Sequence, residues 1–198
     1  MSGALRVLCA FEDRAFEDVA LPMVRRIFDE TGFEPPLIRG PLRSRGCRWK
    51  ALQSILRDEG QEVDLIVIGA DTGPLTVAQK RSAMLDRIER VVDTRRVIFA
   101  LPKPCAEGWL QADLQALKRG VEDELDEPIT LPEDAGSYPT DEEQAKDRLA
   151  GILGRSDIQP LRHGLEFGPA IMRHVDPSAH SSLEELDREL RRWLSLHA

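Results

Sequence analysis

The chain has 198 residues, of which 41% are hydrophobic and 31% are charged. This composition excludes an intrinsically disordered or collagen-like chain, and the length is that of one globular domain with a single core. Lys and Arg number 27 and Asp and Glu 35, so the formal net charge is −8. A protein that coats nucleic acid with its whole surface is therefore not expected, whereas a local basic patch remains compatible with the charge.

The cysteines and the N-terminus indicate the compartment. Cys9, Cys47 and Cys105 are odd in number and have no CxxC spacing, which predicts neither a disulfide framework nor a cysteine zinc site. The first residues lack a basic segment followed by a long apolar one, and no apolar run approaches the roughly 20 residues that cross a bilayer. We expect a soluble, cytoplasmic protein of bacterial type with no membrane partner.

Three segments have the composition of strands, and a fourth is a weaker candidate. Runs 4–11 and 63–70 are apolar, and the second has four β-branched residues. Segment 96–101 is a third apolar run, and segment 36–39 is a weaker candidate. Runs this short that end in charged, Gly or Pro residues predict strands covered on both faces of a sheet.

Helical periodicity separates these strands. Phe16, Ala20, Val24 and Ile27 recur at three- and four-residue steps, which gives one apolar face, and Pro22 predicts a kink or a restart of that helix. The predicted helices lie at about 16–28, 47–59, 76–92 and 108–118.

Alternating strands and helices predict the architecture. This succession is typical of right-handed βαβ units, so we predict an α/β fold with a mainly parallel sheet flanked by helices. The composition changes after Gly120, where residues 121–141 are acidic and proline-bearing. We therefore predict an α/β core over 1–120 and, over 121–198, an exposed acidic loop with a helical C-terminal extension packed on the core.

Two helix starts are predicted in the extension. Thr140 and Glu143 have the spacing of a capping box that opens a short helix. Ser182 and Glu185 have the same spacing before a final helix with one apolar stripe.

Acidic residues follow two of the predicted strands. Glu12 comes after the first strand and Asp71 after the central one. Loops at the carboxyl ends of parallel strands converge, so side chains there project into one crevice. Carboxylates brought together in this way suit a hard cation such as Mg²⁺, which keeps several waters and binds phosphate substrates. The alternative is that both are turn residues, with Asp71 forming an Asx turn before Gly73.

Read together, three segments carry a resemblance. They are an apolar strand that ends in Glu12, Asp71 after LIVIGA, and the stretch FALPKPCAEGWLQAD. The chain resembles, over about 4–118, the Toprim-like proteins of uncharacterised function that often accompany an ATPase in phage-defence operons. In that family the first strand ends in Glu, the middle strand in Asp-x-Asp, and a later segment reads Glu-x-Trp-Leu-x-Ala-Asp. This last pattern is the most specific match and falls on Glu107, Trp109, Leu110, Ala112 and Asp113.

The resemblance implies a Toprim-like fold and a metal-dependent phosphodiester hydrolase, a nuclease, controlled by a partner ATPase. One departure matters, because Gly73 occupies the position of the second aspartate and the full set of acidic ligands is missing. Asp13, Glu107 or Asp113 would have to supply another carboxylate. Glu107 has an alternative as a residue that starts a helix, where its charge is favoured, and Trp109 as an anchor in the core.

A basic run lies between the first two main strands. It reads RGPLRSRGCRWK and holds five cations, which are Arg39, Arg43, Arg45, Arg48 and Lys50. On a flexible loop these residues would contact phosphate groups while the rest of the surface repels nucleic acid. The alternative is a solvated loop whose arginines pair with nearby carboxylates. Lys80 and Arg81 would add charge at the same crevice.

Other reactive residues give weaker signals. The four histidines have no HExxH or similar spacing, and we predict surface or packing roles for them. Cys9 and Cys105 have no nucleophile signature around them and are predicted in or near the core. Neither GxGxxG nor GxxxxGK[ST] occurs, so these nucleotide-binding loops are not expected.

The resulting hypothesis is a Mg²⁺- or Mn²⁺-dependent nuclease acting on DNA or RNA. Glu12 is a ligand or general base, Asp71 and Glu107 are metal ligands, and Glu12 and Asp71 are the catalytic pair. The residues predicted to contact phosphate are Arg43, Arg45, Arg48, Lys50, Lys80 and Arg81. Two alternatives stay open: a catalytically degenerate Toprim-like subunit that binds a protein partner, and a small-molecule phosphatase on the same scaffold.

Overall fold

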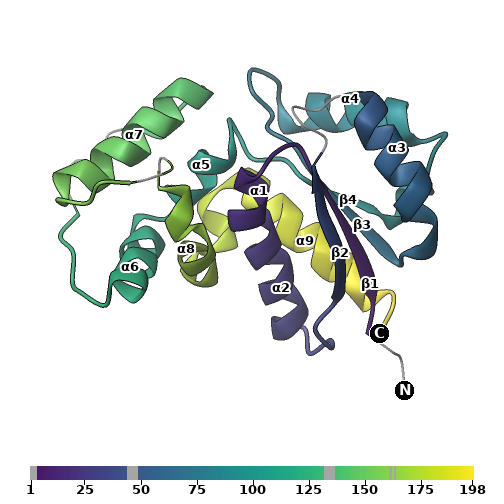
Figure 1. The fold of residues 1–198 in the computed structure, drawn as a ribbon, viewed down its shortest axis with the longest axis horizontal. Helices are drawn as coiled ribbons and strands as arrows, with labels where there is room; N and C mark the ends of the chain where they lie inside the picture. Colours follow the sequence, from purple (N-terminus) through teal and green to yellow (C-terminus); the bar gives the residue numbers. More distant parts are fainter. Residues whose placement is uncertain (1–3, 44–48, 132–136, 161, 163) are drawn as a thin grey trace.

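A four-stranded parallel sheet organises the chain. The computed structural model describes residues 4–43, 49–131, 137–160, 162 and 164–198. In the order in which they pair, the strands are β2 (Leu37–Arg43), β1 (Arg6–Phe11), β3 (Leu65–Gly69) and β4 (Val97–Ala100), and every neighbouring pair is parallel (Figure 1). The predicted α/β class with a parallel sheet flanked by helices is confirmed.

The helices fill the connections and the C-terminal third. The helix predicted at 108–118 is in fact two helices, separated by the turn before Asp113. The α-helices are α1 (Ala15–Asp18), α2 (Ala20–Glu30), α3 (Trp49–Glu59), α4 (Val77–Ile88), α5 (Ala106–Leu110), α6 (Leu114–Leu125), α7 (Glu142–Arg155), α8 (Gly168–His174) and α9 (Ser181–Ser195).

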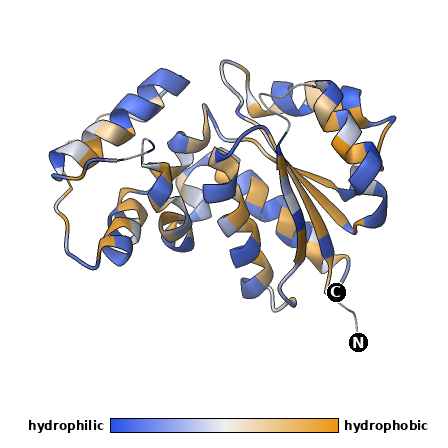
Figure 2. Cartoon of the chain, in the orientation of Figure 1, coloured by the Kyte–Doolittle hydropathy of each residue, from blue (hydrophilic) through white to orange (hydrophobic). Residues whose placement is uncertain are grey.

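Strands β1, β3 and β4 are mostly buried on both faces, as their apolar runs predict, whereas the edge strand β2 is partly exposed. Side chains of a strand alternate between the two sides of a sheet. Val7, Cys9 and Phe11 therefore pack into one apolar cluster, while Leu8 and Ala10 pack into a second cluster on the opposite face. All five are at most 1% exposed, and Figure 2 shows strands of the sheet coloured hydrophobic over much of their length.

Different helices cover the two faces. Leu52 of α3 and Met84 of α4 belong to the cluster on one face. The other cluster combines α1 and α2 with helices from the C-terminal part, and Leu186 of α9 packs there with Val24 of α2. Figure 1 shows α3 and α4 on one side of the sheet and α5 to α8 extending beyond its other side. Among the described residues, no helix has the length and apolar content of a membrane span.

Two predicted helix starts are wrong by one or two residues. Helix α7 is capped by Asp141, whose Oδ1 accepts from the Gln144 N–H at 2.8 Å, rather than by Thr140. Helix α9 is capped by His180 rather than by Ser182. In both cases a neighbouring side chain with a hydrogen-bond acceptor takes the capping position.

Helices α6 and α8 approach each other at Gly120. A Cβ at this position would lie 2.4 Å from the backbone nitrogen of Ile171 in α8. We expect Gly120→Ala to lower the free energy of unfolding by about 1–3 kcal/mol, because the two backbones must separate. Urea unfolding measures this. The control is Gly151→Ala in α7, whose Cβ meets no atom within 4 Å and which should stabilise by about 0.5–1 kcal/mol. Equal effects of the two substitutions would contradict the close approach.

Candidate functional site

The strand order sets the position of the site. In a doubly wound sheet, ligands bind outside the carboxyl ends of the strands where the winding reverses, and the order β2-β1-β3-β4 puts this reversal between β1 and β3. Phe11 pairs with Gly69 at the ends of these strands, and the Glu12 N–H donates to the Gly69 carbonyl at 2.8 Å. The residues that follow both strands therefore lie at one edge of the sheet.

Glu12 and Asp71 meet at this edge. The Asp71 backbone N–H donates to Oε2 of Glu12 at 3.2 Å. The two residues are 59 positions apart in the sequence. The structure therefore confirms that Glu12 and Asp71 lie close together, as the sequence predicts. Both residues therefore lie at the point where the winding of the sheet reverses, which is the usual ligand position in this type of fold.

The Asp71 side chain is directed towards the start of α5. Its Oδ1 accepts from the Ala106 N–H at 3.0 Å, so the carboxylate binds a segment 35 residues away instead of closing the predicted Asx turn. Thr72 fixes the same loop, because its Oγ1 donates to the carbonyl of Pro102 at 2.9 Å. The loop after β3 is therefore tied to the loop after β4.

Glu107 is the buried carboxylate of the site. It lies in the first turn of α5, as expected for a residue that starts a helix, and is only 4% exposed. Its carboxylate is one of the groups that raise the pKa of the Cys105 thiol. Trp109 is fully buried two residues later, which confirms its predicted place in the core. Helix α5 therefore places a core side chain, Trp109, two residues after a buried carboxylate, Glu107.

Burial and nearby charges change the protonation of Asp71. Desolvation first, and then the negative charges of Glu107, Asp13 and Glu12, raise the pKa of Asp71 to about 8. Burial, together with the charges of Glu107 and Asp71, also raises the pKa of the Cys105 thiol. The site is an electronegative region in which the ionised form of a buried carboxyl group is costly without a cation.

The chemistry of these side chains suits a hard cation, but their number is small. Among the described residues, no group of three or more His, Cys, Asp or Glu is arranged to hold a metal ion. Asp113 is not part of the site, since its Oδ1 caps α6 by accepting from Gln115 and Ala116. Mg²⁺ is commonly held by one or two carboxylates with waters in the remaining positions, so the arrangement suits one such ion rather than two.

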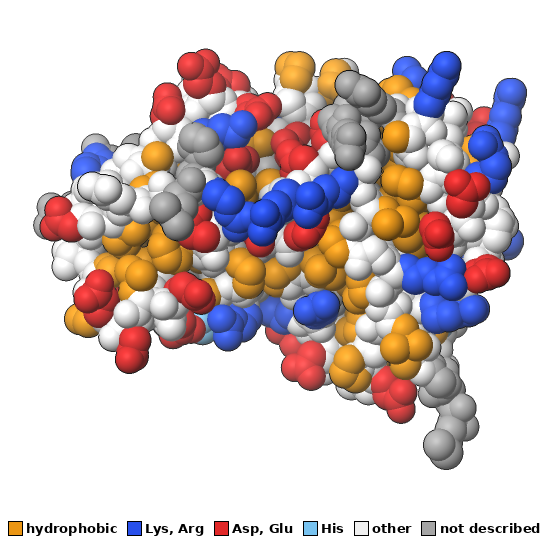
Figure 3. Space-filling model, in the orientation of Figure 1, with side chains coloured by type: hydrophobic (Ala, Val, Ile, Leu, Met, Phe, Trp, Pro, Cys, Tyr) orange, Lys and Arg blue, Asp and Glu red, His pale blue; other side chains and the backbone are white. Residues whose placement is uncertain are grey.

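Two of the six predicted phosphate contacts are engaged elsewhere. Arg43 lies in β2, not in a loop, and its Nε binds Glu17 at 2.5 Å. Arg81 binds Glu185 at 2.7 Å and Glu189 at 2.5 Å, both in α9. For these two arginines the structure favours the alternative of pairing with carboxylates. Figure 3 shows Lys and Arg side chains in a band over α1, with Asp and Glu side chains directly above it.

The remaining predicted cations have different positions. Arg45 and Arg48 lie outside the described residues. Lys50 is exposed in the first turn of α3, and Lys80 is partly exposed on α4. Within the part of the chain that the structure describes, neither lysine forms an ion pair.

Helix α7 contributes residues that the sequence analysis missed. The charge of Glu142 adds to the rise in the pKa of Asp71, and Glu107 contributes to a raised pKa of Lys146. Lys146 Nζ lies 2.5 Å from Oε1 of Glu142. The spacing of four residues predicts this ion pair on a helix, but nothing in the sequence indicates that α7 lies beside α5.

No protein-family model, curated protein or solved structure matches this chain. The similarity to Toprim-like proteins therefore depends on the residue patterns that end in Glu12, Asp71 and Asp113.

Replacing Asp71 should change how stability depends on pH. The pKa of Asp71 is about 8 in the folded protein and is near its ordinary value of 3.8 in the unfolded chain. The folded state therefore holds the Asp71 proton more tightly than the unfolded chain does. The resulting contribution to the free energy of unfolding is fully present below about pH 4 and is lost as the pH rises through about 8. In metal-free protein, Asp71→Asn should remove this loss and become more stable than wild type at pH 8.

Urea unfolding between pH 5 and pH 8.5, in the presence of a chelator, tests this expectation. Glu89→Gln, an exposed carboxylate at the end of α4, is the control and should keep the wild-type slope. Parallel pH profiles for wild type and Asp71→Asn would show that Asp71 titrates normally.

Proposed function

We propose that this chain is a metal-dependent phosphodiester hydrolase of Toprim-like type, a nuclease, with Glu12 and Asp71 as its catalytic pair. One observation carries the proposal: the Asp71 N–H and the Glu12 carboxylate lie 3.2 Å apart at the reversal point of a parallel sheet. Glu107 supports it as the third carboxylate, because its charge acts on Asp71 more strongly than that of any other neighbour.

The roles follow from position and chemistry. Mg²⁺ or Mn²⁺, when bound, supplies a Lewis acid for the phosphate and lowers the pKa of a water molecule. Asp71 and Glu107 hold the cation. Glu12 is a further ligand or accepts the proton of the attacking water. The raised pKa of Asp71 supports this assignment, because a bound cation favours the ionised carboxylate that burial alone disfavours.

DNA or RNA is the substrate, and the resemblance adds a partner ATPase that controls the activity in phage defence. The motif segments support the partner, since the Glu107 to Asp113 stretch has the family pattern. We place the protein in the cytoplasm. Cys9 and Cys105 support this assignment, because both are free and buried, as in proteins of a reducing compartment.

A second candidate function is a catalytically degenerate subunit that keeps the Toprim-like scaffold and binds a protein partner. Gly73 favours it, because it replaces the second aspartate of the family pattern. The absence of a three-ligand group among the described residues also favours it. Metal binding separates the two candidates.

Melting temperature and cleavage test the proposal together. Mg²⁺ or Mn²⁺ at a hundredfold excess over Kd should stabilise the wild type by about 2.7 kcal/mol, because the ion binds only the folded state. Glu12→Gln and Asp71→Asn should lose this gain, and Glu12→Gln should also lose roughly a hundredfold or more in cleavage rate of labelled DNA and RNA oligonucleotides. Glu89→Gln should behave as wild type.

Identical melting of wild type and both variants, with and without metal, would reject the hydrolase and favour the binding subunit. Turnover of p-nitrophenyl phosphate without cleavage of either oligonucleotide would instead assign a small-molecule phosphatase to the same site.

A further inference from the structure

Helix α7 is fixed against the first turn of α5. Gln111, which is 2% exposed, donates through Nε2 to the carbonyl of Glu107 at 3.0 Å and to the carbonyl of Ala145 in α7 at 2.7 Å. Arg148 of α7 donates to Oε1 of the same glutamine at 2.5 Å. A buried amide thus connects the residue next to Lys146 with the residue that carries the buried carboxylate of the site.

Lys146 is the cation that this contact brings to the site. Its ammonium group pairs with Glu142 at 2.5 Å, and 33% of the side chain is exposed. The charge of Glu107 acts on the same ammonium group. Lys146 therefore lies on the part of α7 that Gln111 fixes next to Glu107, and its side chain is partly exposed.

A phosphate that approaches these carboxylates needs a counter-charge. Unit charges of equal sign repel each other, and the repulsion is stronger in partly buried surroundings than in water. Arg43 and Arg81 are already neutralised by glutamates. A groove of about 350 Å³ on α7 is lined by Glu142, Glu143, Lys146 and Asp147. Three of these four side chains are acidic, so Lys146 is the side chain of this groove that attracts a phosphate.

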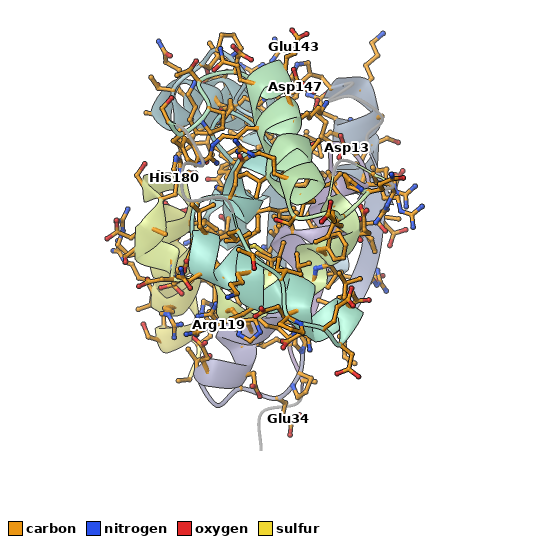
Figure 4. The ribbon with its side chains drawn as sticks, turned by 90° about the vertical axis from the view of Figure 1, so that its left-hand side faces the viewer. Asp13, Glu34, Arg119, Glu143, Asp147 and His180 are labelled. Atoms are coloured by element: carbon orange, nitrogen blue, oxygen red, sulfur yellow. The ribbon has the colours of Figure 1, made fainter. Side chains whose placement is uncertain are left out.

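We infer that Lys146 contacts a backbone phosphate of the substrate, and that α7 is one wall of the substrate-binding surface. This inference rests on the proposed function and extends it to a segment outside the Toprim-like match. Glu142 holds the ammonium group in the free protein and is exchanged for the phosphate when the substrate binds. Figure 4 looks at the molecule from the α7 side, with Glu143 and Asp147 labelled along this helix.

The test is equilibrium binding, measured apart from turnover. Fluorescein-labelled single-stranded DNA and RNA are titrated in Ca²⁺ at several salt concentrations, with fluorescence anisotropy as the readout. Lys146→Met should weaken binding about tenfold, and it should reduce the salt slope by about 0.7. Lys146→Arg should retain most of the binding, because it keeps the charge.

Matched controls come from the same kind of ion pair. Lys118 pairs with Glu122 at 3.7 Å on α6 with the same four-residue spacing, so Lys118→Met should leave affinity and salt slope unchanged. Glu142→Gln should tighten binding, because it releases Lys146. Glu143→Gln removes an equal charge from the next residue of α7 and should tighten it less.

Each outcome decides. Equal affinities of Lys146→Met and Lys118→Met, or a wild type that binds neither oligonucleotide, would overturn the inference. If Lys146→Met weakens binding while the wild type cleaves no oligonucleotide in Mg²⁺ or Mn²⁺, Lys146 is a phosphate contact and the proposed hydrolase activity alone is rejected.

Discussion

The parallel pairing of β1 with β3 is the contact on which the candidate site depends. Its register ends at Phe11 opposite Gly69, so the residues that follow the two strands leave the sheet at the same edge. Gly69 is required there because a Cβ would lie 2.4 Å from the ring of Phe16 and 2.8 Å from the ring of Phe11. Close packing of α1 over the strand end thus sets the direction in which Glu12 departs, and it allows the Asp71 N–H to reach the Glu12 carboxylate.

The electrostatics of this edge distinguish it from an ordinary buried ion pair. Buried carboxylates in proteins are usually compensated by Arg or Lys. Here the pKa of Asp71 rises to about 8 because burial and neighbouring carboxylates act together. Arg43 of β2 and Arg81 of α4 bind glutamates of α1 and α9 instead. These two arginines therefore do not compensate the carboxylates at the strand ends.

Sequence patterns predicted the features that depend on local chemistry. The apolar runs predict β1, β3 and β4, and the rule for parallel strands predicts that Glu12 and Asp71 lie close together. Features that depend on long-range packing were not predictable. Arg43 became part of β2 because the strand extends past Pro41. Asp113 is not in the same helix as Trp109, because the chain turns after Leu110 and the Asp113 carboxylate caps α6.

Contacts from the C-terminal part also determine where α5 lies. The indole N–H of Trp109 donates to Oγ of Ser182 at 2.7 Å, and that hydroxyl group lies 2.9 Å from Nδ1 of His180. Tyr138 stacks on the His180 ring and donates to the carbonyl of Lys103, just before α5. Two C-terminal segments thus anchor the short helix from opposite ends.

That anchoring connects the C-terminal part to the chemistry of the strand ends. A helix of five residues has little stability of its own, so these tertiary contacts hold it in place. Because the start of α5 donates the Ala106 N–H to Asp71 and carries Glu107, the positions of both carboxyl groups depend on residues beyond 120. The predicted resemblance to Toprim-like proteins spans only about residues 4–118, whereas the contacts that hold these carboxyl groups in place extend beyond it.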